Sequence, residues 1–487
     1  MNSLLPMSRT FQSSDCTHNI NCRRHQQRSL EGPNAPITGR VCGRPPAQRP
    51  GPTAARGLCT MLSVRVRFPN RVGKRMGTFR DELLRIQRQN YRRMLRRISD
   101  ELAPQPALAR YEREYRRGLR TYRSLSNTHE LLRSIVTSDI VFHGDYHTLR
   151  QSQRAVLYVL RRVARKRRTV LCLEMFYSSD QALLDRYQAG ALGEKRFLRA
   201  IDYVHTWAFK WHHWKPILSF CREQGIPVRG HNVKSPDGRP TLRKRDTHSA
   251  RIIADAVEEH PGALVYVVDG DYHIAPCHLP DRVERELRKR GRSARRTIVY
   301  QNVDRLYWML AQDGKEEADV LRIGDDAFCL INTTPINKLQ SYVNWLEFAG
   351  DAYYPVNSRW EELTDTNDTT TIASLVRTLC EIMEIHYPSE ALERLSVYYA
   401  NNHDFLQIVA ESPQLRPLLS SIKRKIRQGE GFLIEYGQVE APMFVIYLAS
   451  SSLSMAAEEA MHLLHAARRD RGGPQGSSFD RFYALVL

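Results

Sequence analysis

The sequence reads SDIVFHGDYH at residues 138–147 and ALVYVVDGDYH at residues 263–273, and these two stretches decide the fold that we predict. In each, a run rich in β-branched and aromatic residues, typical of a buried strand, leads into the same tetrapeptide, Gly-Asp-Tyr-His. A four-residue repeat arises easily by chance in a long chain, so its position carries more weight than its identity. Each glycine marks a sharp exit from a strand.

Strand-like and helix-like segments alternate around these two stretches. The predicted strands are residues 139–143, 169–173, 227–231, 263–269 and 297–302. The predicted helices between them are residues 149–166, 179–189, 195–224, 247–260 and 280–290. This alternation predicts the α/β class, with a mostly parallel sheet flanked by helices on both faces, over residues 136–332.

The flanking regions have a different character. Residues 1–77 are rich in Pro, Gly, Arg and Ser, and we expect them to be disordered; a true start at Met61 or Met76 is the alternative. Residues 78–135 predict a basic, amphipathic helical extension that packs one face on the next domain. Residues 333–487 predict a mainly helical C-terminal region that ends in a long helix at 442–469.

The positive charge is concentrated near the N-terminus. The net charge is +20, and residues 1–140 contain 27 Lys and Arg against 10 Asp and Glu. The excess therefore says little about the α/β domain, and we do not expect nucleic acid as a partner. Nine scattered cysteines, no apolar stretch long enough for a signal peptide and no membrane span predict reduced thiols and a cytoplasmic location.

Ionisable residues gather at the predicted strand ends. Ligands of a parallel sheet bind outside the carboxyl ends of its strands, where His147, Glu174 and His273 should converge. Two histidines and a carboxylate suit an open site for Mn, Fe or Zn, with Asp145 and Asp271 orienting the imidazoles or acting as bases. The same residues could act without metal, one histidine taking a proton from water. Histidines that merely cap backbone carbonyls are the structural alternative.

Two further groups of residues are candidates for the same rim. Trp207 and Trp211 fall on one face of a predicted helix and suit either the core or the wall of a flat apolar ligand. His231 and Asn232 follow the third strand and should line the rim. In the last helix Glu458, Glu459, His462 and His465 include a Glu-x-x-His step, but no matching second copy exists in the sequence, so a solvated face is favoured.

Several motifs together resemble a known family. They are VFHGDYH at 141–147, LCLEMFYSSDQALLDRYQAGAL at 171–192, PVRGHNV at 227–233 and VVDGDYHIAPCHLPDRVEREL at 267–287. In this order they are similar to a ChaN-type domain of the haem-binding uptake and Tiki superfamily, over roughly residues 136–305. The resemblance implies an α/β fold in which Gly144 with His147, Glu174, and Gly270 with His273 form the site. Asp145 stands where many relatives have glutamate.

The resemblance implies two kinds of function. ChaN-like relatives handle haem or iron, so the first hypothesis is a haem-binding protein in which Tyr146, Tyr272 and rim histidines are axial ligands. Relatives that resemble metal-dependent peptidases and esterases imply the second, a hydrolase that uses His147, Glu174 and His273 around a metal-activated water. The expected partners are haem or a hydrolysable small molecule, and a second copy of the chain in a homodimer.

Overall fold

The computed structural model describes residues 75–101, 106–207, 209–234, 241–348, 369–383, 385–400, 402–438, 441–450 and 452–469. These residues all fall in one compact unit of the chain. Nearly all of the segment for which we predicted disorder, residues 1–77, lies outside this range. The disorder expected for those residues therefore stays a prediction.

The larger sheet has eight strands in the order β1-β7-β8-β6-β2-β5-β3-β4. Their bounds are β1 Ser124–Ser126, β2 Ile140–Asp145, β3 Thr169–Tyr177, β4 Val228–Asn232, β5 Leu264–Gly270, β6 Arg296–Gln301, β7 Val320–Arg322 and β8 Ala327–Leu330. The pairs from β8 to β4 are all parallel. At the other edge β7 pairs antiparallel with both β8 and β1, so β7 alone runs against the other strands. The mostly parallel sheet predicted from the sequence is confirmed.

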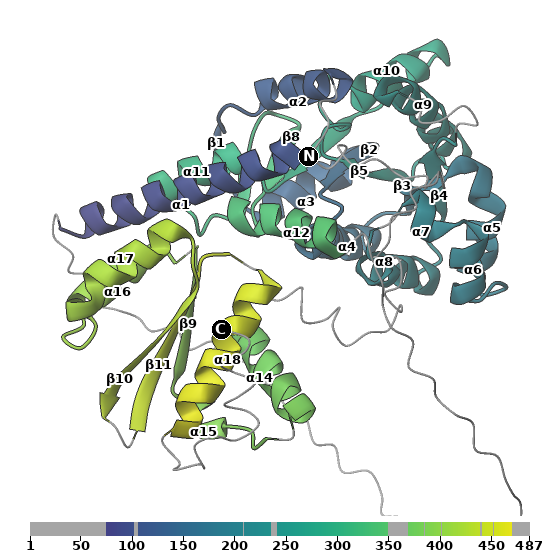
Figure 1. Cartoon of the computed structure of the whole chain (residues 1–487). Helices are drawn as coiled ribbons and strands as arrows, with labels where there is room; N and C mark the ends of the chain where they lie inside the picture. Colours follow the sequence, from purple (N-terminus) through teal and green to yellow (C-terminus); the bar gives the residue numbers. More distant parts are fainter. Residues whose placement is uncertain are drawn as a thin grey trace, which may run out of the picture. The chain divides into compact units, whose positions relative to one another are not determined.

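Helices cover both faces of this sheet (Figure 1). One face is packed by α2 (Pro106–Gly118), α9 (Leu242–Glu259), α10 (Leu279–Lys289) and α11 (Asp304–Gln312). The other is packed by α3 (Thr128–Thr137), α4 (Arg150–Ala164), α5 (Gln181–Gln188), α6 (Glu194–Ala200), α7 (Tyr203–Thr206) and α8 (Trp211–Glu223). Alternate residues of β5 enter the two cores, Val265 on one side and Tyr266 on the other, as a strand buried on both faces requires.

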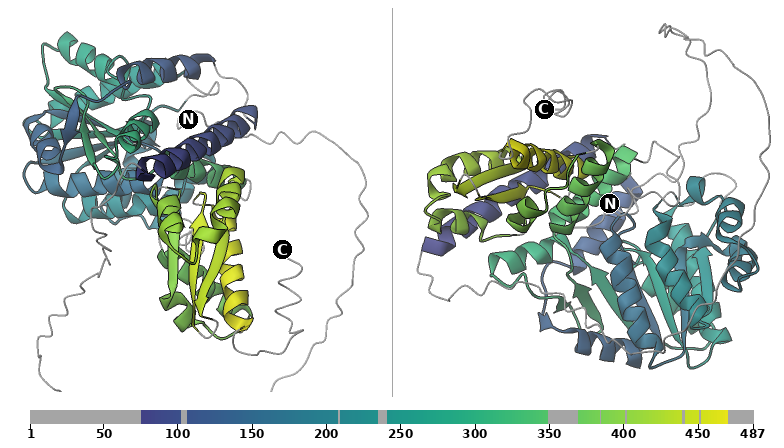
Figure 2. Two further views of the ribbon diagram at one scale, coloured as in Figure 1. Left: turned by 90° about the vertical axis from the view of Figure 1, so that its left-hand side faces the viewer. Right: turned by 90° about the horizontal axis from the view of Figure 1, so that it is seen from below.

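The C-terminal region is mainly helical but contains a second sheet, of three strands in the order β10-β11-β9 (Figure 2). Its strands are β9 Leu395–Tyr399, β10 Phe432–Gln438 and β11 Ala441–Leu448. Its helices are α14 Thr369–Met383, α15 Ser389–Glu393, α16 Phe405–Glu411, α17 Leu419–Gln428 and α18 Leu453–Arg469, with α12 (Pro335–Phe348) before them. The helix predicted over 442–469 is found only in its second part, as α18, because the first part is β11, whose residues Ala441 to Tyr447 pair with β10.

The basic helix predicted near residue 78 is α1, Arg75–Glu101. Leu83 and Ile86 on one of its faces are fully buried with residues of α16 and α17. Ile98, farther along, packs with Tyr146 and with Leu339 of α12. The helix is therefore an integrated element of the fold, and its apolar stripe serves packing, as the sequence predicted.

Gly144, near the end of β2, has to be a glycine because residues that follow β5 approach it closely. A Cβ atom on Gly144 would lie 2.5 Å from Asp271 Oδ1 and 2.9 Å from Ile274 Cδ1. Real Cβ atoms do not tolerate such distances, so any side chain here would have to displace the side chains of Asp271 and Ile274, which are both buried. Gly144 thus lets the two strand exits lie against each other.

We expect Gly144→Ala to destabilise the protein by about 1 to 3 kcal/mol, because the added methyl group overpacks a buried contact. Gly118→Ala is the matched control, since a Cβ atom at Gly118, the last residue of α2, would meet nothing within 4 Å. Urea unfolding followed by circular dichroism measures both. Equal midpoints for Gly144→Ala and the wild type would contradict the close approach.

Candidate functional site

The two Gly-Asp-Tyr-His sequences leave the sheet side by side. Strands β2 and β5 are neighbours, and their register places Asp145 opposite Gly270. The residues that follow, up to His147 and His273, therefore emerge at the same edge of the sheet. This edge is formed by the carboxyl ends of the parallel strands, where ligands of such sheets bind.

Glu174 reaches this edge from within β3. The sequence predicted that the strand ends before Glu174, but β3 continues to Tyr177. The register of β3 with β4 shifts between Leu173 and Tyr177, so Glu174 lies in an irregular stretch. Such irregularities redirect side chains, and the carboxylate of Glu174 is turned into the site with only 5% of the residue exposed.

Both carboxylate oxygens of Glu174 are engaged. Oε1 accepts a hydrogen bond from Arg245 of α9, and Oε2 accepts one from the backbone N–H of Gly270 at 2.7 Å. A buried ionised carboxylate is costly unless it is paired and hydrogen-bonded, and Glu174 has both kinds of partner. The guanidinium of Arg245 therefore fixes the position and the charge of the carboxylate.

The two histidines face Glu174 in the same way. Nε2 of His147 lies 3.5 Å from Oε2 of Glu174, and Nε2 of His273 lies 3.9 Å from Oε1. Behind each ring a carboxylate contacts Nδ1: Asp145 at 2.7 Å from His147, and Asp246 of α9 next to His273. Each imidazole thus has one nitrogen on an orienting carboxylate and the other directed toward the same glutamate.

The charges of the site are set by burial and by this pairing. Burial opposes ionisation of Glu174, but Arg245, His147 and His273 hold the pKa of its carboxyl well below its usual range. Asp269 has the opposite behaviour, because burial and the neighbouring charge of Glu174 raise its pKa well above the usual range. The pKa values of these two neighbouring carboxyls are therefore shifted in opposite directions, downward for Glu174 and upward for Asp269.

His147 is a stronger base than an ordinary histidine. Burial lowers its pKa, but the hydrogen bond with Asp145 and the charge of Glu174 outweigh burial, and the net shift of the pKa is upward. The second oxygen of Asp145 accepts a hydrogen bond of 2.5 Å from Gln153 of α4. His147 is therefore held by a carboxylate that is itself held in place.

Aromatic rings form a wall beside His147. The ring centroids of Trp207 and Phe209 lie 4.7 and 4.9 Å from that of His147. Trp211 instead packs against Tyr203 at 5.4 Å, in the core under the sheet. The predicted helix over 195–224 is wrong, because the chain forms α6, α7 and α8 there, and Trp207 and Trp211 do not share one helical face.

His231 and Asn232 lie at the end of β4, next to the site. Nδ1 of His231 is 3.1 Å from the hydroxyl of Ser249, and burial lowers the pKa of His231 to about 4, so the ring is neutral. The side chain of Asn232 accepts a hydrogen bond from the backbone of Val233 and caps the strand end. Within the described residues, Nε2 of His231 and Nε2 of His273 are buried without a hydrogen-bond partner.

The tyrosines of the two tetrapeptides lie in different apolar clusters. Tyr146 packs with Leu149 and Tyr342, and Lys338 lies over its ring at 4.9 Å. Tyr272 packs with Tyr115 of α2 at 5.3 Å. Their role as axial haem ligands stays a prediction, and in this arrangement both rings contribute to packing.

Asp271 does not hold His273 as Asp145 holds His147. The carboxylate at Nδ1 of His273 is that of Asp246, and Oδ1 of Asp271 is buried among the described residues without a hydrogen-bond partner. Burial raises the pKa of Asp271 to about 6. The two tetrapeptides are therefore not equivalent in their surroundings.

Three polar residues that contact the site were not predicted from the sequence: Arg245, Asp246 and Gln153. All three lie on helices, whereas the predicted site residues lie at or near strand ends. Arg245 and Asp246 stand in the charged run Leu-Arg-Lys-Arg-Asp of α9, which is typical of a solvated helix start. Only the packing of α9 against β4 and β5 turns these two side chains toward Glu174.

One group of donor atoms at the site lies close enough together to hold a metal ion. Glu174, Asp269 and His273 offer oxygen and nitrogen atoms that all lie within 4.8 Å of one another, a set that differs from the predicted His147, Glu174 and His273. The donor types suit a divalent ion. Against this, both oxygens of Glu174 are occupied, one of them by a cation.

The Glu-x-x-His step of α18 gives no metal cluster among the described residues. Glu459 is buried, and burial raises its pKa to about 8. Nε2 of His462 lies 4.0 Å from Glu458 one turn before it. Of the four residues only Glu458 is exposed, while His462 and His465 are half-buried. The solvated face favoured from the sequence is therefore correct for Glu458 and wrong for Glu459.

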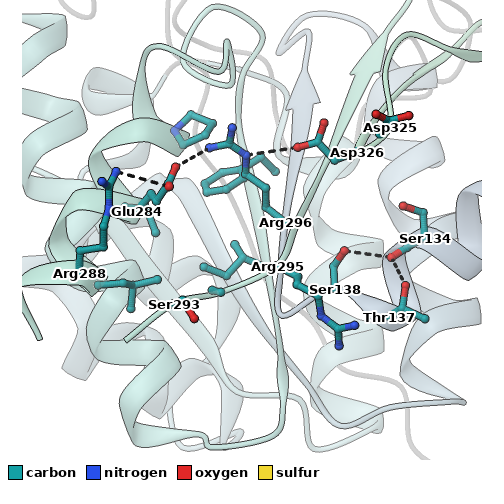
Figure 3. A pocket seen from close by; sticks show the side chains of 16 residues that line it. Ser134, Thr137, Ser138, Glu284, Arg288, Ser293, Arg295, Arg296, Asp325 and Asp326 are labelled. Atoms are coloured by element: carbon teal, nitrogen blue, oxygen red, sulfur yellow. Dashed lines mark hydrogen bonds and ion pairs between the residues drawn. The ribbon is translucent and has the colours of Figure 1, made fainter. Parts of the chain in front are cut away.

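A pocket of about 550 Å³ lies at the opposite edge of the sheet (Figure 3). Its lining residues come from the end of α3, the start of β2, α10 and the residues around β6 and β8. Glu284 is paired with Arg288 and Arg296, and Arg296 is paired with Asp326 (Figure 3). These cations are satisfied by carboxylates, and the pocket is distinct from the histidine site.

The comparisons with known proteins agree with the motifs. Residues 131–239 match the family model described as "Haem-binding uptake, Tiki superfamily, ChaN". The resemblance inferred from the motifs is confirmed over this segment, which contains His147 and Glu174 but ends before His273. No curated protein matches the chain. Within the described residues no helix is long and apolar enough to cross a membrane.

Solved structures with a distant likeness include three proteins. The first is a structure of ChaN from Campylobacter jejuni, described as "Cofacial heme binding to ChaN of Campylobacter jejuni". It is 13% identical to this chain with a TM-score of 0.29, and the match covers 37% of this chain and 87% of that one. "The structure of the type III effector HopBA1" has 13% identity and a TM-score of 0.29, and covers 42% and 92%. The RRSP effector domain from Vibrio vulnificus has 19% identity, a TM-score of 0.24 and 30% coverage of each chain. At these TM-scores the likenesses carry no argument.

Asp271→Asn should stabilise the protein at pH 8 by roughly 3 kcal/mol, because the wild-type carboxyl has to ionise without a hydrogen-bond partner for Oδ1 in the described structure. Its folded pKa is raised, so the folded state is favoured below about pH 4 and loses that advantage as the pH rises through about 6. The gain should nearly vanish at pH 4. Denaturant titrations at both pH values measure it.

Asp325→Asn is the control for this experiment, since the Asp325 side chain is 93% exposed. A stabilisation of Asp271→Asn that is equal at pH 4 and pH 8 would show that ionisation of Asp271 is not its cause.

Proposed function

We propose that the site hydrolyses an ester or amide bond by acid–base catalysis that needs no metal ion. The proposal rests mainly on the arrangement of His147 and His273. Each has a carboxylate at Nδ1 and directs Nε2 toward Glu174. A carboxylate behind an imidazole fixes its tautomer and stabilises the imidazolium, which is what proton transfer to and from water requires.

His147 is the proposed general base. Its Nε2 accepts a proton from a water molecule held next to Glu174, and Asp145 stabilises the imidazolium that forms. The resulting hydroxide adds to the carbonyl carbon of the substrate. His273 then gives a proton from Nε2 to the leaving group, and the proton on His147 returns to His273 across Glu174, which lies between them. The net change is one water consumed per bond cleaved.

Arg245 supports the metal-free form of the reaction. Its guanidinium already neutralises Glu174, so a divalent ion would have to displace or repel a buried cation. The metal-dependent hydrolase predicted from the sequence uses the same side chains and is the alternative outcome of the test. In that form Glu174, Asp269 and His273 would hold the ion, which would activate the water.

We expect His147→Ala and His273→Ala each to lower kcat/KM by at least about 100-fold on a panel of p-nitrophenyl esters and fluorogenic peptides. The wild-type rate should rise with pH through the raised pKa of His147, because only the neutral imidazole accepts a proton. Activity should survive exhaustive treatment with EDTA.

His205→Ala is the matched control. His205 also pairs with an aspartate, Asp202 at 2.6 Å, but its side chain is 75% exposed, so its loss should leave the rate unchanged. Loss of activity in EDTA with recovery on adding metal would favour the metal-dependent form. No turnover of any substrate by the wild type would overturn the hydrolase proposal.

The second candidate function is haem binding. The description of the matched family model supports it, as does the wall formed by Trp207 and Phe209 beside His147, since a porphyrin packs on flat apolar rings. His147 is the candidate axial ligand nearest to this wall, and the binding of haem there would require the buried site to open.

Titration with haemin should then shift the Soret band at one saturating equivalent, and His147→Ala should weaken binding by about 10-fold or more, whereas His205→Ala should not. Tyr146→Phe and Tyr272→Phe examine the axial ligands predicted from the sequence. An unchanged haem spectrum in the presence of the protein would exclude this candidate.

A further inference from the structure

A second cluster of metal-ligating side chains lies outside the site described above. It consists of Glu114 on α2, and Cys277 and His278 in the turn before α10. A carboxylate oxygen, a thiol sulfur and an imidazole nitrogen of these residues all lie within 4.8 Å of one another. His278 is buried, Glu114 is half-buried and Cys277 is exposed, so the cluster is open to solvent on one side.

The orientation of His278 is fixed from behind. Nδ1 lies 2.5 Å from the backbone carbonyl oxygen of Tyr272, and a carbonyl can only accept, so Nδ1 carries the hydrogen. The ring of Tyr111 stacks on the imidazole with centroids 3.9 Å apart. A histidine held in this way presents the lone pair of Nε2 forward, as metal-binding histidines do.

The lone pair of Nε2 faces a carboxylate. Oε2 of Glu114 lies 2.8 Å from Nε2 of His278, while Oε1 of Glu114 is paired with the exposed Arg110. Two lone pairs at this distance require a positive centre between them, either a proton or a metal ion. The thiol of Cys277 lies next to both atoms. It favours a metal ion over a proton, because a thiolate is a strong zinc ligand whereas a simple ion pair has no role for a thiol.

We propose that Glu114, Cys277 and His278 form a binding site for a zinc-class divalent metal ion, with a solvent molecule in the fourth position. Ligation would need only a small widening of the contact between Glu114 and His278, to accommodate metal bonds of about 2.0 Å to nitrogen and oxygen and about 2.3 Å to sulfur. The site would tie α2 to the turn that follows β5. It is independent of the proposed hydrolytic function.

The site differs from the Glu174 site in its chemistry. No cysteine belongs to the metal cluster at Glu174, whereas the second cluster contains one. Cobalt bound by a thiolate absorbs in the near ultraviolet through charge transfer from sulfur, and cobalt bound by nitrogen and oxygen alone does not. A charge-transfer band that is lost in Cys277→Ser therefore reports that the second cluster holds the ion.

The test uses the full chain, stripped of metal and titrated with Co²⁺ and, in competition with a chromogenic chelator, with Zn²⁺. We expect the wild type to show the charge-transfer band at one equivalent and Cys277→Ser to lack that component. Glu114→Gln should bind Zn²⁺ at least about 10-fold more weakly, because loss even of a group behind a ligand costs about 10- to 100-fold.

Two controls complete the design. Glu112→Gln changes a carboxylate of the same helix that pairs with Arg116 outside the cluster, and its spectrum and affinity should equal those of the wild type. The double variant His147→Ala, His273→Ala should keep the band, so failure of the hydrolase proposal leaves this result intact. Identical cobalt spectra for the wild type and Cys277→Ser, with both proteins folded by circular dichroism, would overturn the proposal.

Discussion

The ion pair between Glu174 and Arg245 is the constraint on which the rest of the site depends. A carboxylate that is only 5% exposed can stay ionised only if cations and N–H groups compensate the lost water. Arg245 comes from α9 and the Gly270 N–H from the end of β5, so the pair requires both elements at fixed positions. Burial and the charge of Glu174 raise the pKa of Asp269, and the hydrogen bond with Asp145 together with the charge of Glu174 raises the pKa of His147.

The parts of the site that lie on strands could be predicted from the sequence, because the carboxyl ends of neighbouring parallel strands meet at one edge. His147, Glu174 and His273 were found in this way. Arg245 and Asp246 could not be found, because they lie in a highly charged helical segment whose pattern is also that of a solvent-exposed helix start. Their role follows from the packing of α9, which no local pattern encodes.

The same distinction applies to the fold. The five longer strands of the large sheet, β2 to β6, have a strong local signal, and their predicted positions agree with the structure to within a few residues. The strands β1, β7 and β8 were not predicted, because runs of three or four residues are too short to show a period. The run from Ala441 to Leu448 is equally apolar, and its period does not separate a buried helix from a strand. Its antiparallel pairing with β10 decides the matter. The helix predicted at 195–224 is interrupted near Trp207, where Phe209 turns toward His147.

Tyr111 contacts Asp246 and His278, although it lies outside the segment that the family model matches. Its hydroxyl donates a hydrogen bond of 3.0 Å to Asp246, the carboxylate that orients His273, and its ring stacks on His278. Yet Tyr111 precedes the segment matched by the family model, which begins at residue 131. A fragment cut at that boundary would expose Asp246 to water and lose the stacking partner of His278. The smallest autonomous unit for expression or domain grafting therefore has to begin upstream of α2.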